Sequence, residues 1–304
     1  MPVETFNFDL RAWHLGSNQT LWRYVDLETL IRLMATFDRS TGLADLFFPR
    51  LDHLRLSDPS EGRFPRDVAK LQAKSAQSTQ ESPTLTPEQK QAFLTQRSRL
   101  ESDGEYRESV FPDDSLPALF NSLATTTDWG VARFGDLFLG RLHYVSCWHL
   151  AHVESHAMWR IYSKGRGVAV KTTVGRLERS LVPNQGTAYV GRVQYSTSAT
   201  QAKWPTEILT LGYLPFAFWK RLPFAYEKEV RVVIPQGLSE SFFDADEVGR
   251  TVPVRLRDLI TEIVVSPFGE PDLTEVVRAT VDRFIPQLRV RPSTLLDLPP
   301  YASA

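Results

Sequence analysis

The sequence predicts an α+β protein with a single core, in which a central mixed, largely antiparallel sheet is flanked by helices. Stretches with strand and helix patterns follow one another without the regular βαβ repeat of a doubly wound sheet. The chain has 304 residues, of which 42% are hydrophobic, and this is enough to build one large core. The sequence shows no internal repeat at solenoid periods. We therefore expect residues 1–304 to form one domain.

The N-terminal part is predicted to begin with a short strand and a helix. Residues 21–24 place two aromatic residues around an arginine and are expected to be extended. Asp26 is a suitable N-cap for the following helix, whose apolar face consists of residues at helical spacing: Leu27, Leu30, Ile31 and Met34. Residues 43–51 are predicted to form a strand or a buried turn. Residues 70–108 are rich in Gln, Ser, Thr, Lys and Glu, which predicts a polar, helical surface insertion.

The rest of the chain supplies the other strands of the predicted sheet. Clusters of β-branched or alternating apolar residues place them at 142–148, 167–173, 189–195, 229–234, 260–265 and 288–290. The residue patterns between them place helices within 115–141, at about 152–163, at 205–219 and at 270–284. This mixed order favours an α+β fold over a parallel α/β fold.

Composition limits the classes of function. The net charge is −1, so the chain lacks the overall basic character of a protein that works mainly by wrapping nucleic acid, although local basic patches leave nucleic-acid contact open. The single cysteine, Cys147, cannot form an intramolecular disulfide, which fits a reducing compartment. The N-terminus lacks the features of a signal peptide, and the apolar stretches are too short to span a bilayer. We expect a cytoplasmic protein that does not act on a membrane.

Three histidines near Cys147 raise a first chemical hypothesis. His149, His152 and His156 would share one face of a continuous helix, and three imidazoles can hold zinc while leaving a position open for water. This arrangement would suit a zinc-dependent hydrolase. The pattern is not the His-Glu-x-x-His of metalloproteases, and a strand-to-helix junction would separate the three rings, so we assign no metal ligands. Cys147 lies in an apolar strand, where burial raises the pKa of a thiol and lowers its reactivity.

Two aromatic residues precede a glycine turn in the middle of the chain. Trp159 and Tyr162 stand three positions apart and therefore lie on one helical face. Gly165 and Gly167 then end the helix and begin a strand. The two rings can form the wall of a pocket that stacks on a planar ligand, or they can both belong to the core.

Charged residues also stand within apolar strands. Glu229 and Arg231 point to the same face of the late strand, which continues as Val-Val-Ile, and Lys220 precedes this run. Such a pair is either a structural ion pair or a site in which a guanidinium keeps a carboxylate ionised. Near the N-terminus, Arg23 stands before Tyr24 and can bind a phosphate or carboxylate through two N–H bonds, or stack on its neighbours at a sheet edge.

As a set, these motifs resemble a widespread bacterial family, domain-of-unknown-function 2971. The resemblance covers about residues 20–295 and departs from the family pattern at 70–108. The motifs that carry it are the aromatic-Arg-Tyr strand, Asp58-Pro59 with Glu61, the Trp159-x-x-Tyr162 helix, and the run from Tyr226 to Arg231. Membership of this family implies no activity.

The chain also resembles ADP-ribosyltransferases, which combine an early strand carrying Arg or His, a middle aromatic element and a late strand carrying Glu. The resemblance implies that NAD is the cofactor, that Arg23 holds its ribose or phosphate, and that Trp159 or Tyr162 stacks on nicotinamide. Glu229 would bind a ribose hydroxyl and stabilise the oxocarbenium-like transition state. On this basis we assign Glu229, Arg231 and Tyr162 to catalysis and assign cofactor binding to Arg23, Tyr24, Trp159 and Lys220.

Three functions therefore remain open. The first is a NAD-consuming ADP-ribosyltransferase-like enzyme, such as a toxin or a defence effector, with a macromolecular target. The second is a non-catalytic module that recognises protein or nucleic acid and uses 70–108 as its partner surface. The third is the zinc-dependent hydrolase.

Overall fold

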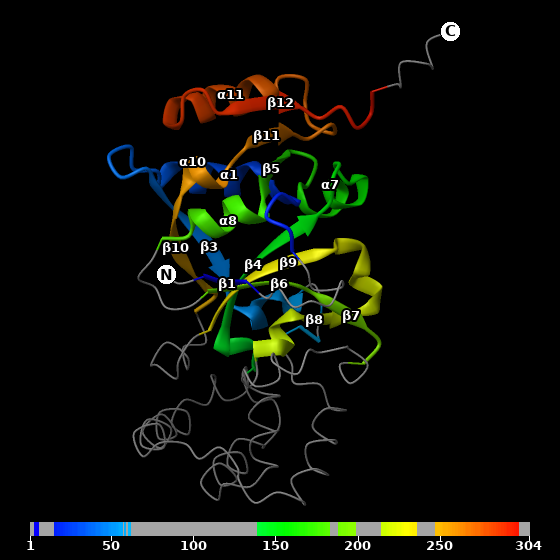
Figure 1. Cartoon of the computed structure of the whole chain (residues 1–304). Helices are drawn as coiled ribbons and strands as arrows, with labels where there is room; N and C mark the ends of the chain where they lie inside the picture. Colours follow the sequence, from blue (N-terminus) through cyan, green and yellow to red (C-terminus); the bar gives the residue numbers. More distant parts are fainter. Residues whose placement is uncertain are drawn as a thin grey trace, which may run out of the picture.

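The structure is a computed structural model that describes residues 3–5, 15–56, 58, 60–61, 139–182, 188–198, 214–235 and 247–297 (Figure 1). The predicted insertion at 70–108 lies outside the described residues, as do most of the helical pattern at 115–141 and the first part of the helix expected at 205–219. Among the described helices, none is both long and apolar enough to cross a membrane.

The core is built on an eight-stranded sheet with the order β1-β6-β9-β4-β2-β5-β11-β12. In that order its strands are β1 (Val3–Thr5), β6 (Ala188–Arg192), β9 (Glu229–Pro235), β4 (His143–Leu150), β2 (Thr20–Asp26), β5 (Gly167–Thr173), β11 (Glu262–Val265) and β12 (Arg289–Pro292). The outer pairs β1–β6 and β11–β12 are parallel, and the other neighbours are antiparallel. The predicted α+β class with a mixed, largely antiparallel sheet is confirmed.

The sheet is split in its middle. β2 pairs with β5 along its whole length, and β4 pairs with β9 from His143 to His149. Between themselves, however, β2 and β4 have matched positions only at Leu21↔Leu150 and Trp22↔His149. The part of β2 after Trp22 therefore separates from the facing part of β4. The two half-sheets meet only at these two positions. We name the opening beyond them the fork.

Helices cover both faces of the sheet. One face packs against α1 (Leu27–Ala35), α8 (Val174–Ser180), α10 (Leu256–Leu259) and α11 (Leu273–Phe284). The other face packs against α7 (His156–Tyr162), through the cluster that Trp159 forms with Trp22 and Tyr24. In Figure 1, β12 and α11 lie at the top, and the strands of the other half-sheet lie below them.

Two small sheets and four short 3₁₀ helices complete the described fold. The small sheets pair β3 (Leu43–Pro49) with β10 (Gly249–Arg255) and β7 (Gln194–Ser196) with β8 (Trp219–Arg221). The 3₁₀ helices are η1 (Leu51–Leu56), η2 (Leu139–Leu142), η4 (Leu214–Phe218) and η5 (Leu222–Glu227). The prediction of a helix at 205–219 is therefore wrong for its described residues, which form η4 and the start of β8.

The segments around α1 and α7 show how local chemistry sets the helix ends. The carboxylate of Asp26 accepts a hydrogen bond from the Thr29 N–H at 2.9 Å, which confirms Asp26 as the N-cap of α1. Helix α7 begins later than expected, at His156, because Ser155 caps it. The residues immediately before Ser155 form a turn after β4 instead of a helical extension.

Candidate functional site

A cavity of about 380 Å³ opens at the fork. Because the two half-sheets separate here, residues from both faces of the sheet reach it. We name it the carboxyl cavity and define it by its polar and aromatic lining: Trp22, Arg23, Tyr24, Asp26, Thr29, Phe47, Cys147, Trp148, His149, Tyr162, Lys164, Lys220, Glu227 and Glu229. Its size falls in the range of about 300–1,000 Å³ that is usual for ligand pockets.

Lys220 lies at the centre of the charged groups behind this cavity. Its ammonium nitrogen is 2.5 Å from a carboxylate oxygen of Glu227 and 2.8 Å from one of Glu229. A third carboxylate, that of Glu61, approaches to 3.5 Å. All four side chains are buried, so these contacts replace the water that the charges would otherwise need.

Arg231 supports the same carboxylates from behind. Its guanidinium donates to Glu229 at 2.6 Å, to Glu61 at 2.8 Å and to the Ala217 carbonyl at 2.7 Å. The side chain is fully buried and is not part of the cavity lining. Arg231 therefore acts on a ligand only through Glu229.

The loop that carries Glu61 is fixed at two points. Asp58 accepts hydrogen bonds from the Nε and Nη2 atoms of Arg221 at 2.9 Å and 2.5 Å, and Glu61 binds Arg231. Arg221 ends β8 and Arg231 lies in β9. The Asp58-Pro59-x-Glu61 motif thus joins the small β7–β8 sheet to the central sheet.

This cluster contains three carboxyl groups (Glu61, Glu227 and Glu229) and two cations (Lys220 and Arg231). With every group ionised, a buried net charge of −1 would remain, and one bound proton removes it. Burial first, and then the neighbouring Glu229, raise the pKa of Glu227 to about 7. Burial opposes ionisation of Glu229 too, but Arg231, Glu227 and Lys220 hold its pKa well below the ordinary value. Below about pH 7 the pair therefore holds one proton, which Glu227 carries.

The backbone between the two glutamates brings their side chains together. Glu227 ends η5 and Glu229 begins β9, while Lys228 between them has a φ of 42°, in the left-handed region. Residues other than Gly, Asn and Asp rarely adopt this conformation. Here it joins the end of η5 to the start of β9, and the carboxylates on both sides of it reach the Lys220 ammonium.

Hydrogen-bond donors around the cavity are fixed by burial. Tyr162 donates to Glu227 at 2.7 Å, and burial together with that carboxylate raises its pKa, so the phenol keeps its proton. His149 Nδ1 lies 2.6 Å from the Glu227 carbonyl, which can only accept, so Nδ1 carries the hydrogen. Burial lowers the pKa of His149 from 6.5, which leaves the ring neutral at pH 7 with Nε2 as an acceptor.

Arg23 occupies the opposite side of the fork. Its guanidinium donates to the Ser146 hydroxyl at 2.7 Å and to the Phe47 carbonyl at 3.4 Å. These two bonds use two of the five N–H donors of an arginine, and no carboxylate pairs with Arg23 among the described residues. Burial lowers the pKa of Arg23 from its ordinary 12.5, but the guanidinium of an arginine is not deprotonated in proteins, so Arg23 remains a cation.

The fork brings together five residues that the sequence assigned to the site: Arg23, Tyr24, Tyr162, Lys220 and Glu229. Trp159 is not among them, because it is fully buried and packs edge-on against Tyr24 at 4.9 Å between ring centroids. Tyr24 accepts a hydrogen bond from the Ser155 N–H at 2.8 Å, which ties α7 to β2. Trp159 thus belongs to the core, the alternative that the sequence had left open.

The three histidines do not form a cluster. His149 lies within β4, whereas His152 is in the exposed turn after it and His156 begins α7. The shared helical face on which the zinc hypothesis depended is therefore absent. Among the described residues, no group of three or more His, Cys, Asp or Glu side chains is placed to hold a metal ion. Cys147 lines the cavity, and burial raises the pKa of its thiol.

Two members of the site stood in motifs of the sequence but received no catalytic or binding role there. Glu227 shares the proton of the pair, but the expected strand began only at Glu229, and nothing in the local pattern indicates the left-handed turn at Lys228. Glu61 was noted only as part of a motif, and its partner Arg231 is 170 positions away. The signal that could have found Glu227 is its place two residues before Glu229, which would give both the same face if the strand extended backwards.

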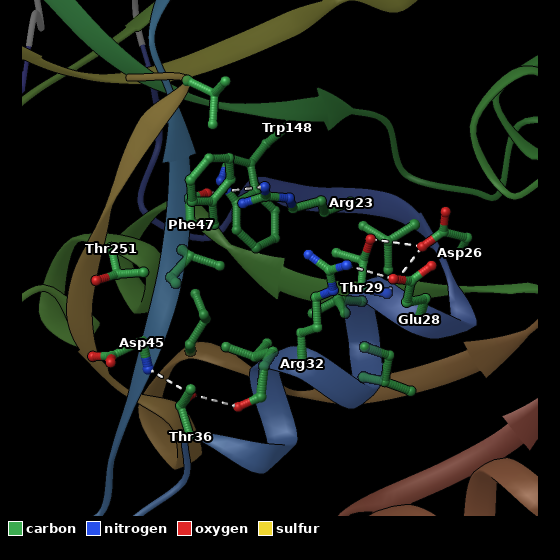
Figure 2. Close-up of a pocket in the computed structure, with 17 residues that line it drawn as sticks. Arg23, Asp26, Glu28, Thr29, Arg32, Thr36, Asp45, Phe47, Trp148 and Thr251 are labelled. Atoms are coloured by element: carbon green, nitrogen blue, oxygen red, sulfur yellow. Dashed lines mark hydrogen bonds and ion pairs between the residues drawn. The ribbon is translucent and has the colours of Figure 1, made fainter. Parts of the chain in front are cut away.

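A second cavity of about 570 Å³ adjoins the first and is shown in Figure 2. It lies between α1, β3 and β10, and we name it the α1 groove. Six residues line both cavities: Arg23, Val25, Asp26, Thr29, Phe47 and Trp148. The residues that line only the α1 groove include an apolar set: Leu30, Leu33, Leu46, Val170, Val248 and Leu259.

The site thus offers an ionised carboxylate, a carboxyl group that titrates near neutrality, protonated phenols and a cation that has no carboxylate partner in the described part of the chain. Such a set can stabilise positive charge, transfer a proton and hold an anion. Comparisons of the chain with protein-family models, curated proteins and solved structures found no match.

Proposed function

We propose that the chain is an enzyme of the NAD-consuming, ADP-ribosyltransferase-like type, which breaks the bond between nicotinamide and ribose in the carboxyl cavity. One observation carries this proposal. Glu227 and Glu229 have pKa values shifted in opposite directions, and they line the same cavity as Tyr162 and Arg23. Pairs of carboxyl groups whose environments separate their pKa values are typical of acid–base catalysis.

Glu229 supplies the fixed negative charge in this mechanism. The C–N bond breaks with its electron pair going to the nicotinamide nitrogen, and positive charge develops on the ribose. A carboxylate that stays ionised beside this charge lowers the barrier, because it needs no reorganisation during the reaction. Lys220 and Arg231 keep Glu229 ionised and fixed in place. Their positive charges also weaken the negative electrostatic potential that Glu229 exerts on the ribose.

Glu227 supplies the proton transfer. Nicotinamide leaves as a neutral molecule, so the group that must lose a proton is the incoming nucleophile, either water or a hydroxyl of a macromolecular target. As the nucleophile bonds to the ribose carbon, its proton passes to the Glu227 carboxylate. A pKa of about 7 means that about half of the Glu227 groups are ready to accept a proton at neutral pH.

The remaining lining residues suit the other parts of the ligand. The rings of Tyr24 and Tyr162 offer apolar faces for a planar group, and their phenol protons are retained because burial raises both pKa values. Arg23 has unused N–H donors and no carboxylate partner among the described residues, which suits a phosphate. Lys220 is saturated by carboxylates, so we assign it to holding the pair and not to the ligand.

The test is whether the protein releases nicotinamide from NAD, in reactions with and without cell extract. Chromatography measures the nicotinamide. Glu227→Gln and Glu229→Gln should each lower the rate by about 10²- to 10⁴-fold, the usual contribution of a positioned proton-transfer group or charge. Glu275→Gln, the same change at an exposed carboxyl group on α11, is the matched control and should retain the rate. Circular dichroism spectra and thermal melts of each variant separate loss of chemistry from loss of fold. No nicotinamide release by the wild-type protein under either condition would contradict the proposal.

One observation favours a non-catalytic recognition module instead. Both oxygens of Glu229 are already bonded, to Lys220 and Arg231, as in a structural ion pair. In that case the conservative variants would alter stability alone. Deletion of residues 70–108, which would carry the partner surface, should then abolish capture of a macromolecular partner.

A further inference from the structure

Strand β3 has a free edge that faces the α1 groove. Among the described strands, β3 pairs with β10 alone. Asp45 lies opposite Pro253, which has no N–H, so these two residues form a pair without main-chain hydrogen bonds between them. In such a pair the N–H and C=O groups point away from the partner strand. By alternation, the same holds for Leu43 and Phe47, two positions before and after Asp45.

Neither end of this edge offers a complete pair of main-chain groups to another strand. The Leu43 N–H donates to the Thr41 hydroxyl at 3.3 Å, and the Leu43 carbonyl accepts from the Asp38 N–H at 2.8 Å. At the other end of β3, Pro49 has no N–H. Only the middle of the edge can therefore pair.

The middle of the edge offers one donor and one acceptor. The Asp45 N–H donates to the Thr36 hydroxyl at 2.9 Å (Figure 2), and the Phe47 carbonyl accepts from Arg23 at 3.4 Å. The Asp45 carbonyl and the Phe47 N–H have no hydrogen-bond partner in the described part of the chain. An extended segment that lies opposite Leu46 can satisfy both groups, because a neighbouring strand bonds to main-chain groups two positions apart.

The groove beside this edge selects the side chains of such a segment. Leu46 is buried, and the floor of the groove includes Leu30 and Leu259, so the residue opposite Leu46 must be apolar. The next residue of the segment lies beside the exposed Asp45, whose carboxylate has no cation partner in the described part of the chain. The other acidic residues that line the groove each form an ion pair. A basic residue therefore complements this end of the edge.

We propose that the free edge of β3 binds an extended segment of a partner protein, with an apolar residue over Leu46 and a basic residue beside Asp45. Main-chain pairing gives such a contact its affinity, and the side chains give it specificity. β3 itself contains no basic residue, which argues against pairing with β3 of a second copy of the chain. Because six residues line both cavities, the bound protein lies next to the carboxyl cavity. The inference goes beyond the proposed function, since it depends on the edge and not on the chemistry of that cavity.

Titration by NMR in the absence of NAD tests this proposal. The probes are two peptides with blocked ends, Thr-Thr-Lys-Val-Thr-Thr-Thr and its reverse, which offer the lysine to Asp45 in opposite strand directions. One of the two should bind about 2- to 5-fold more tightly than the other, the usual effect of an exposed ion pair. The Phe47 amide should show one of the largest chemical-shift changes, because its N–H gains an acceptor.

Three variants separate the main-chain bonds from the ion pair. Phe47→Pro removes the N–H and should weaken both peptides by about 10-fold or more, whereas Phe47→Val keeps the N–H and should stay within about 3-fold of the wild-type protein. Proline is tolerated where the N–H of an edge strand faces away from the sheet. Asp45→Asn should still bind both peptides but lose the difference between them.

Thermal melts establish whether each variant is folded, and Asp45→Asn, an exposed change, provides the test if Phe47→Pro does not fold. The proposal is overturned by an unchanged Phe47 amide with both peptides at millimolar concentration, by equal affinities of Phe47→Pro and Phe47→Val, or by a difference between the peptides that persists in Asp45→Asn. A wild-type dimer that Phe47→Pro converts to monomers would also overturn it, because the edge would then belong to a second copy of the chain.

Discussion

At the scale of single residues, the site depends on how five buried charges reach neutrality. Removing one partner from such a cluster leaves an uncompensated charge, which typically costs about 3–5 kcal/mol. A proton is a less costly solution, and the geometry directs it to Glu227, the carboxyl group that Arg231 does not contact. The same requirement that stabilises the fold thereby creates a group able to transfer a proton at neutral pH.

The shared proton predicts an unusual dependence of stability on pH. The pKa of Glu227 rises from its ordinary 4.5 to about 7 in the folded protein. Between these values the folded state keeps a proton that the unfolded chain loses, so the contribution of Glu227 to stability is present below 4.5 and lost as pH rises to about 7. In Glu227→Gln this loss should be absent. Urea melts at several pH values across the window measure the difference in the free energy of unfolding.

The control for this experiment is Glu275→Gln, which changes an exposed carboxyl group on α11. Its pH dependence should follow that of the wild-type protein. The depressed pKa of Glu229 acts in the opposite direction, because it contributes stability that is lost only as pH falls below its ordinary 4.5. If wild-type stability were flat or rising between pH 4.5 and 7 relative to Glu227→Gln, the shared proton would not reside on Glu227.

Single residues also show what the sequence could and could not reveal. Arg23 and Glu229 were identifiable because a charged residue in an apolar strand needs a partner or a ligand. Trp159 could not be assigned between core and pocket, since a helical face alone does not say which neighbour covers it. Glu61 could not be placed because its partner lies in a strand far along the chain.

At the scale of elements, the turn from η5 into β9 is the feature that creates the carboxyl pair. Lys228 must hold a left-handed conformation, which costs a side chain with a Cβ about 1 kcal/mol. We expect Lys228→Gly to leave stability nearly unchanged, because relief of this strain offsets the larger entropy of the unfolded chain. Lys228→Val should lower the free energy of unfolding by about 1–3 kcal/mol, since β-branched residues avoid positive φ. Urea denaturation measures both changes.

A matched change elsewhere separates strain from chemistry. Gln287, in the turn after α11, also has a positive φ, of 74°, and it does not line the carboxyl cavity. Gln287→Val should therefore cost similar stability but leave nicotinamide release intact, whereas Lys228→Val should reduce both. Equal nicotinamide release in the two valine variants would show that the turn does not position Glu227 and Glu229.

Elements were predictable where their signal was local. β5 was placed at its observed bounds, and β2 and β9 within a few residues, because their β-branched and aromatic runs are continuous. The helix expected at 205–219 ran into the first residue of β8, because the three residues of this strand become extended only by pairing with β7. The small β3–β10 sheet was missed in part for the same reason: β10 received no prediction.

At the scale of the whole molecule, the fork is the property that no local pattern contains. β2 and β4 each have a full partner on their outer side, so sequence signals for the two strands are those of ordinary central strands. Only the register between them shows that pairing stops after Trp22. The opening lets residues of both sheet faces meet one ligand, which explains why Arg23 and Glu229 line one cavity although they belong to different half-sheets.

The fork predicts a distinctive pattern of amide hydrogen exchange. Amides of an antiparallel strand point alternately to its two neighbours. In β2, the amides after Trp22 that face β5 should exchange slowly, while those that face β4 should exchange faster, because their partner strand has separated. Strand β9, paired on both sides between Val230 and Val233, should be protected at every position of that stretch. Residue-resolved exchange by NMR distinguishes the two patterns. Uniform protection along β2 would mean that the half-sheets close against each other in solution, which would remove the cavity on which the proposed chemistry depends.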